Sequence, residues 1–296
     1  MDSFSISQLA QYSGIKPHTI RIWEQRYNAL QPSRSEGNTR FYNGTQLRRL
    51  LNIVSLTSSN HKVSELCAMP DEKLIKLLDD LNDHTPVNEH SEYFISQLIL
   101  AGLNYDELHF EKIFSHCLLR FGIKKAYLEV IYPLLVRIGS MWSGNVMPPA
   151  VEHFMSNCIR QKLFTAIDSL PPSKNNGDTW LLFLPEDEFH DTGLLLAHYL
   201  IRLAGKKVIY LGGNVPMQSL KTAIKSIEPQ HLLLFLVHHD QPADTDKYLK
   251  NLSSDFNGKV YVSGNKKLIG TLKTRKNIQW LQSVEDLQQQ LSIVAV

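Results

Sequence analysis

The C-terminal part of the chain alternates apolar runs with amphipathic helical runs, and this alternation restricts the fold more than any other feature. The apolar runs read TWLLFLP, VIYLGG, HLLLFLV, KVYVSG and NIQWLQ, and helical patterns separate them. Strands that are apolar throughout are buried on both faces, and helices between them provide the crossovers of a parallel sheet. We therefore predict a doubly wound, Rossmann-like (flavodoxin-like) parallel sheet over residues 178–296.

The middle of the chain, residues 88–172, carries helical patterns throughout. They read EYFISQLILAG, DELHFEKIFSHCLL, KKAYLEVIYPLLVRIGSMW and PAVEHFMSNCIRQKLFTAI. Consecutive helices joined by short Gly, Pro or Asn breaks are typical of an antiparallel four-helix bundle. Segments of linker composition flank it at 83–90 and 171–177. The chain is thus predicted to be an α plus α/β multidomain protein, with domains at 1–83, 88–172 and 178–296.

Residues 1–83 contain short helical patterns with one turn-rich interruption. Ser5 fits the N-cap of a first helix, and Gly14 fits its C-terminal end. Pro17 opens a second helix, because a proline at the first helical position loses no hydrogen bond. The polar stretch PSRSEGNTRFY that follows predicts a β-hairpin, and further helices follow the hairpin. Together these elements predict a winged helix-turn-helix.

Basic side chains are concentrated in this N-terminal segment. Residues 1–60 hold seven Lys and Arg against three Asp and Glu, a net charge of +4, whereas the rest of the chain has −2. A basic module on a slightly acidic body is typical of a nucleic-acid-binding protein, and the alternative is a solvated surface without a ligand. The second helix would read base edges in the major groove, and the hairpin would contact phosphates and the minor groove. The residues predicted to bind DNA are Lys16, His18, Thr19, Arg21, Arg26, Arg34, Asn38, Arg40 and Tyr42.

Composition excludes several other classes of protein. No apolar run approaches the roughly 18 residues that a membrane span needs, and the N-terminus lacks the basic flank and apolar stretch of a secretory signal. The three cysteines, Cys67, Cys117 and Cys158, are odd in number and far apart. That spacing excludes a disulfide framework and CxxC zinc or redox motifs. We expect a cytoplasmic protein that does not contact a membrane.

Residues 4–55 resemble the winged helix-turn-helix of the MerR family. The resemblance rests on the turn Ser13-Gly14-Ile15, the helix motif T-I-R-x-W-E, and a hairpin in which Arg34 and Arg40 precede Tyr42. It implies a transcription regulator that binds a double-stranded operator with inverted repeats, as a dimer or a tetramer. RNA polymerase or an antagonist protein are further partners that such a regulator can have. The cysteine cluster of the metal-sensing members is absent from the sequence.

The sequence E-x-H-x-x-G, from Glu188 to Gly193, directly follows the first predicted strand. In a doubly wound sheet this loop lies at the carboxyl ends of the strands, where ligands bind. A neutral imidazole of His190 could bind a metal there, while Glu188 or Asp191 holds the other ring N–H and fixes the tautomer. The alternative interpretation is the start of a helix that happens to carry a histidine.

The same motif resembles the D-x-H-x-x-G signature of cobalamin-binding domains, with Glu in place of Asp. The resemblance implies that His190 is the lower axial ligand of cobalt. In the preceding helices, Trp142 followed by Glu152-His153 resembles the W-x9-E-H element of the CarH/LitR type of light-responsive MerR regulator. It implies that the helices cover the upper face of the cofactor, with adenosylcobalamin favoured over methylcobalamin. The implied cofactor-binding residues are Trp142, Glu152, His153, Glu188, His190, Asp191, Gly193 and Gly264.

The chain departs from the cobalamin-domain pattern at several positions. Phe235-Leu236-Val237 stands where a Ser or Thr is expected, Ser263-Gly264-Asn265 where a Gly pair is expected, and Ser143 where light-sensing relatives often have a His. His238 and His239 end the third strand and could replace the missing contacts. These departures leave open a regulator that kept the fold, lost the cofactor and acts through protein contacts. A third alternative, a corrinoid methyl carrier, is disfavoured by the DNA-binding segment and by the lack of an acid–base or nucleophile set, so we expect no enzyme.

Overall fold

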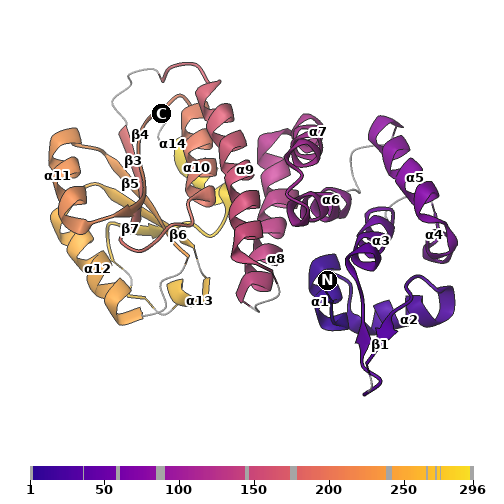
Figure 1. Ribbon diagram of the computed structural model, residues 1–296. Coiled ribbons are helices and arrows are strands. Elements are labelled where there is room, and N and C mark those ends of the chain that lie inside the picture. Colours follow the sequence, from indigo (N-terminus) through magenta and orange to yellow (C-terminus); the bar gives the residue numbers. More distant parts are fainter. Residues whose placement is uncertain are drawn as a thin grey trace. The chain divides into compact units, whose positions relative to one another are not determined.

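The computed structural model divides the chain into two compact units, Met1–Ile159 and Arg160–Val296, which we describe separately (Figure 1). Within them, the structure describes residues 3–35, 37–57, 61–84, 91–143, 147–173, 179–237, 242–264, 266–270, 272–273 and 275–293. Among these residues, no helix combines the length and the apolar character that crossing a membrane requires.

The first unit begins with the predicted helix-turn-helix, formed by α1 (Ile6–Ser13) and α2 (Pro17–Tyr27). A capping box starts α1: the Ser5 side chain accepts from the Gln8 N–H at 3.3 Å, and the Gln8 side chain accepts from the Ser5 N–H at 2.7 Å. Gly14 ends α1 with a φ of +72°, a left-handed conformation that favours glycine. Both predicted helix ends and the position of Pro17 are therefore confirmed.

The predicted hairpin and its following helices complete the head, the name used here for residues 3–84. Strands β1 (Ser33–Arg34) and β2 (Arg40–Phe41) pair antiparallel. Helix α3 (Gly44–Ser55) follows, then α4 (Val63–Ala68) and α5 (Asp71–His84). The buried side chains of α1 to α3 form one apolar core, to which Leu9, Ile20, Leu50 and Leu51 contribute.

The rest of the first unit is helical: α6 (Ser91–Leu103), α7 (Glu107–Ala126), the π-helical turn η1 (Tyr127–Ile131), α8 (Tyr132–Ser143) and the first part of α9 (Pro149–Asp168). The predicted break between the second and third helical patterns is a kink at Gly122, which has a φ of +67°. The π turn ends just before Pro133, which has no N–H to donate to the preceding turn. Met155 of α9 packs against Gly102 of α6, where a side chain would collide.

Buried polar contacts join the head to α6 and α8. The Gln97 side-chain amide donates to Asn52 Oδ1 at 3.2 Å and to Ser55 Oγ at 3.0 Å, and all three side chains are buried. The Arg137 guanidinium binds both carboxylate oxygens of Glu92 at 2.7 and 2.9 Å and lies against Gly14, at the turn of the helix-turn-helix. Because Gln97, Asn52 and Ser55 satisfy one another away from water, they favour one specific docking of the head on α6.

The second unit is a five-stranded parallel sheet in the order β4-β3-β5-β6-β7. Its strands are β3 (Thr179–Pro185), β4 (Lys207–Val215), β5 (His231–Leu236), β6 (Lys259–Gly264) and β7 (Ile278–Trp280). The helices between and after them are α10 (Thr192–Leu203), α11 (Met217–Ile227), α12 (Pro242–Asp255), α13 (Lys266–Ile269) and α14 (Val284–Ile293). This order is the flavodoxin-like one, in which the chain reverses direction across the sheet between its first and third strands, here β3 and β5.

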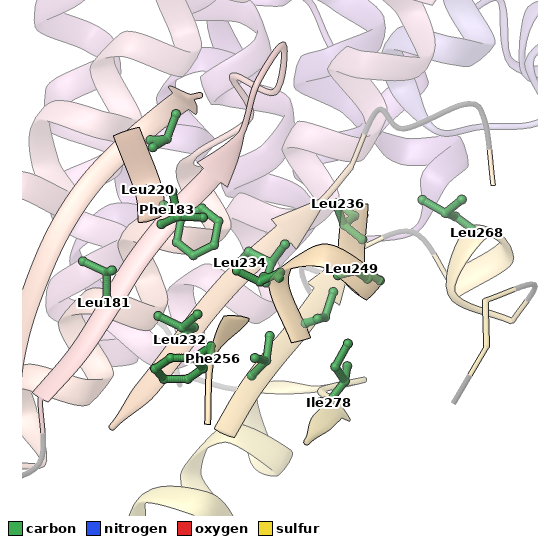
Figure 2. Packing of buried hydrophobic residues seen from close by; sticks show 14 residues of the cluster. Leu181, Phe183, Leu220, Leu232, Leu234, Leu236, Leu249, Phe256, Leu268 and Ile278 are labelled. Atoms are coloured by element: carbon green, nitrogen blue, oxygen red, sulfur yellow. The ribbon is translucent and has the colours of Figure 1, made fainter. Parts of the chain in front are cut away.

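Alternate residues of each strand pack on opposite layers of helices. Leu181, Phe183, Leu232 and Leu234 point toward the layer formed by α11 and α12, where they belong to one buried cluster (Figure 2). On the other face, Trp180, His231 and Tyr261 stack across three neighbouring strands, with ring centroids 4.4 and 5.0 Å from that of Trp180. Strands β3, β5 and β6 are thus largely buried on both faces, as the apolar runs predicted, whereas β4 at the edge of the sheet is mostly half-buried.

The predicted fold class is confirmed: a winged helix-turn-helix, helical segments and a doubly wound parallel sheet. One element is shorter than predicted, because the helical pattern after β6 forms only the four residues of α13. The domain limits at 1–83, 88–172 and 178–296 stay predictions, since 85–90 and 174–178 lie outside the described residues.

Candidate functional site

Helix α2 has one buried side and one exposed side. Ile20 and Trp23 are buried in the head, whereas Arg21 and Arg26 are exposed. The other predicted DNA-binding residues near this helix, Lys16 and His18, are also exposed, and Thr19 is half-buried. The arrangement follows from helical spacing, because residues three or four apart share a face. The exposed side of α2 therefore presents cations and hydrogen-bond donors together.

Glu24 connects α2 to the hairpin. Its carboxylate accepts from Arg40 Nε and from the Tyr42 hydroxyl, each at 2.8 Å. Tyr42 is only 1% exposed, and burial together with its bond to Glu24 raises the pKa of its hydroxyl. The hydrogen bond to Glu24 likewise raises the pKa of Arg40. Arg40 and Tyr42, predicted to contact DNA, are thus placed where they hold the hairpin on α2, and sequence reasoning had assigned Glu24 no role.

Arg34 and Arg49, two further basic residues of the head, have different surroundings. Arg34 and Asn38 are exposed on the hairpin, and the Arg34 guanidinium donates to the Asn38 side chain. Arg49 instead acts inside the head: it donates to the carbonyl oxygens of Ala29, Cys67 and Met69 at 2.7 to 2.8 Å and pairs with Asp71. The exposed group can meet a polyanion, whereas Arg49 holds α3 against the segments around it.

In the second unit, Glu188 organises the loop after β3. Its side chain is 2% exposed, and its Oε1 lies 2.7 Å from His190 Nδ1 and accepts from the N–H groups of Phe189 and His190. Its Oε2 accepts from the N–H of Val237 at 2.9 Å, at the end of β5. The carboxylate therefore joins the two strand ends between which the sheet reverses direction, and it fixes the His190 ring.

This contact determines what His190 can do chemically. Half of its side chain is exposed. A proton on Nδ1, shared with Glu188, leaves the lone pair on Nε2, and a neutral imidazole nitrogen of this kind is a common metal ligand. The sequence left Glu188 and Asp191 open as partners of the His190 ring, and in the structure it is Glu188 that contacts the ring.

Asp191 has a different set of partners. The Arg160 guanidinium binds its two carboxylate oxygens, with Nε and Nη2 each 3.0 Å away, and the Tyr210 hydroxyl donates to Oδ2 at 3.0 Å. Asp191 is 5% exposed and stands at the N-cap of α10. The loop that carries His190 is thus held at both ends, by Glu188 on one side and by Asp191 on the other.

Two glycines of the predicted site are required by close packing. A Cβ on Gly193 would lie 2.7 Å from the Phe235 ring, so Phe235 occupies the space beside the start of α10. A Cβ on Gly264 would overlap the backbone of Leu236, its partner in the sheet, and Gly264 has a φ of +137°. Both positions lie at the carboxyl edge of the sheet, where a ligand of such a fold is expected.

The other predicted residues lie in the first unit or outside the described part. Glu152 and His153 lie on α9 and pair with each other, Oε2 to Nδ1, at 2.9 Å. Trp142 is a residue of α8 whose side chain is not among those described, and His238 and His239 lie outside the described residues. The grouping of Trp142, Glu152 and His153 with His190 stays a prediction.

His198 of α10 predicts a pH dependence of this region. Its ring stacks on that of Tyr210 at 5.3 Å, and burial, followed by the charge of Arg202, lowers its pKa from 6.5 to about 4. Between pH 4 and 6.5 the unfolded chain therefore binds a proton at His198 that the folded chain does not bind. The contribution of the neutral His198 to the free energy of unfolding is fully present above pH 6.5 and is lost as the pH drops toward 4. We expect the wild type to lose about 1 kcal/mol more free energy of unfolding between pH 6.5 and 5 than His198→Phe. Urea titrations at both pH values test this, and equal losses in the two proteins would contradict it.

Comparisons with known proteins agree with this architecture. The family model of the MerR HTH family regulatory protein matches residues 4–69, and that of the B12 binding domain matches residues 91–166. The HTH-type transcriptional repressor CarH of Myxococcus xanthus is 26% identical over 257 residues, 84% of this chain and 84% of CarH. The repressor CarA of the same organism is 26% identical over 248 residues, 83% of this chain and 81% of CarA. The Methanosarcina barkeri monomethylamine corrinoid protein has a similar fold, with a TM-score of 0.52 at 13% identity over 65% of this chain and 94% of that one.

Proposed function

We propose that this chain binds a cobalamin, and that the cobalamin controls its assembly and its affinity for an operator. The chain joins a MerR-family helix-turn-helix domain to a B12-binding domain and is homologous to CarH and CarA. The observation that carries the proposal is the half-exposed His190, oriented by the buried carboxylate of Glu188 at the ligand edge of the sheet. The matched domains and the relatives, which are named transcriptional repressors, support a helix-turn-helix transcription regulator.

The residues at the sheet edge suit a corrinoid. His190 Nε2 would bind the cobalt, with Glu188 as the group that keeps the ring neutral and oriented. Phe189, 65% exposed beside His190, offers an apolar surface of the kind that the lower face of a corrin needs. Asp191, Gly193 and Gly264 would shape the same edge. When bound, adenosylcobalamin would supply a cobalt–carbon bond that light can break.

The upper side of the cofactor is assigned to the helices of residues 91–166. Trp142, Glu152 and His153 would line it, as the W-x9-E-H resemblance implies. The match of the B12 binding domain to this segment supports the assignment. Ser143 offers no imidazole, so we propose that any light response proceeds without a histidine at that position; His153 is the nearest alternative donor in sequence.

Phe235 supports a second candidate function, a regulator that kept the fold without the cofactor. Its ring fills the space beside Gly193, and it stands where the family resemblance implies a hydroxyl. In this alternative the sheet edge would bind a partner protein, and the buried contacts of Glu188 and Asp191 would serve stability alone.

One experiment separates the two candidates. The full chain is incubated in darkness with adenosylcobalamin or methylcobalamin, desalted, and scanned in the visible range. Retained absorbance at one cobalamin per chain is expected under the first candidate, with the adenosyl form retained better. A colourless protein after both incubations would leave the second candidate.

The proposed control of assembly needs its own measurement. We expect a dimer or tetramer to bind an inverted-repeat operator, because one small head makes few contacts and protein symmetry matches the symmetry of the site. A ligand shifts such an assembly only through different affinities for its two states. Size-exclusion chromatography and operator binding are compared for the apo form, the loaded form in darkness, and the loaded form after green light. Three identical elution profiles with equal operator affinity would contradict control by cobalamin or light. In that case, RNA polymerase or an antagonist protein would be tested as the partner that controls operator binding.

A further inference from the structure

The exposed side of α2 carries one apolar side chain that the core of the head does not use. Ile22 is 40% exposed, whereas Ile20 and Trp23 of the same helix are 0% and 8% exposed. Its neighbours on the exposed side are His18, four residues earlier, and Gln25, three residues later, both exposed. Ile22 therefore lies among polar and cationic side chains, where its exposed part can gain apolar contact only from a ligand.

The surroundings of Ile22 indicate which ligand would cover it. Arg21 and Arg26 flank it along the helix, and both are exposed. A cationic helix face is complementary to the phosphates that border the major groove. Within that groove, the base edges offer one apolar group of similar size, the C5 methyl of thymine.

We infer that Ile22 reads a thymine in each half of the operator, by packing its side chain on the thymine methyl. This deepens the proposed function, because it rests on α2 entering the major groove. A β-branched side chain such as Ile is restricted at χ1 on a helix, so little side-chain entropy is lost on contact. Arg21 and Gln25 supply the polar base contacts beside it, and Glu24 holds the hairpin that fixes the helix over the groove.

The probe is obtained by selection. The full chain is used to enrich duplexes from a random library, with and without adenosylcobalamin in darkness, and the dissociation constant of the enriched duplex is then measured. Each thymine of the duplex is next replaced, one symmetry-related pair at a time, by deoxyuridine, which removes the methyl group and keeps the base pair. The same series is measured for Ile22→Ala and for Ile75→Ala, whose isoleucine is 49% exposed on α5.

The expected result is specific to one thymine pair. For the wild type and Ile75→Ala, deoxyuridine at that pair weakens binding about fourfold for each half-site, the effect of one buried methyl group. For Ile22→Ala, thymine and deoxyuridine duplexes bind equally, at the affinity of the wild type for deoxyuridine or below.

Each other outcome identifies what is wrong. Two results would overturn the inference, because each would show that Ile22 does not read a methyl group. In one, deoxyuridine weakens binding of the wild type and of Ile22→Ala by the same factor at every thymine pair. In the other, deoxyuridine weakens binding of neither protein at any pair. If selection enriches no sequence under either condition, the proposed operator binding itself fails. The two failures are therefore distinguishable.

Discussion

A His190→Ala chain incubated with adenosylcobalamin is expected to emerge from desalting without visible absorbance, although it folds like the wild type. The imidazole is half-exposed, so its removal leaves no cavity in the core. What is lost is the imidazole that we propose as the cobalt ligand, in the ring that Glu188 contacts through Nδ1. We expect affinity for the cobalamin to fall more than about 100-fold. This loss is larger than the one that follows when only the hydrogen-bond partner of a metal ligand is removed. Equilibrium dialysis gives the affinity, and circular dichroism verifies the fold.

Glu188→Gln is the graded companion of that substitution. The amide keeps the shape and one acceptor oxygen but loses the negative charge that shares the Nδ1 proton of His190. We expect affinity to fall by about 10- to 100-fold, with a changed visible spectrum, because the imidazole becomes a weaker donor. Leu203→Ala, a change at an exposed residue at the end of α10, serves as the control and should retain cobalamin like the wild type. If His190→Ala retains as much cobalamin as the wild type, His190 is not the ligand and the proposed lower side of the site is wrong.

Local signals in the sequence predicted most of the fold. Ser5, Gly14 and Pro17 mark helix ends because their chemistry acts over a few residues of chain, and the structure places each at such an end. Strands β3, β5 and β6 were predictable because a strand that is buried on both faces carries apolar side chains at nearly every position. The carboxyl-edge position of His190 follows from the same alternation.

Contacts between distant residues could not be predicted in this way. The hydrogen bonds of Gln97 to Asn52 and Ser55 join residues more than 40 positions apart, and a sequence shows three polar residues without showing that they meet. The sequence predicted only a short linker at 83–90 between the head and the helices, and it gave no sign that these groups are buried together. The partners of Asp191 were hidden for the same reason, because Arg160 and Tyr210 come from elements on either side of it in the chain.

A Glu24→Ala chain is expected to lose about 3 kcal/mol in the free energy of unfolding. The carboxylate is 10% exposed and holds two donors, so its removal leaves the buried Tyr42 hydroxyl and the Arg40 guanidinium without their acceptor. Tyr42→Phe removes one hydrogen bond and should cost about 1 kcal/mol. Glu72→Ala, at an exposed acid in the first turn of α5, should cost only about 0.5 kcal/mol. Urea unfolding of the full chain, followed by circular dichroism, measures all three.

Operator binding by the same variants separates two effects of Glu24. Loss of a negative charge near the DNA strengthens attraction to any duplex, whereas a hairpin released from α2 can no longer place Arg34 and Asn38 at fixed positions. We therefore expect the ratio of operator affinity to random-duplex affinity to fall about tenfold in Glu24→Ala, even where random-duplex affinity rises. Glu24→Gln keeps an acceptor for Tyr42 and should retain more of the ratio. An unchanged ratio in Glu24→Ala, under conditions in which the protein is folded, would show that the hairpin contributes no specificity and that α2 alone reads the operator.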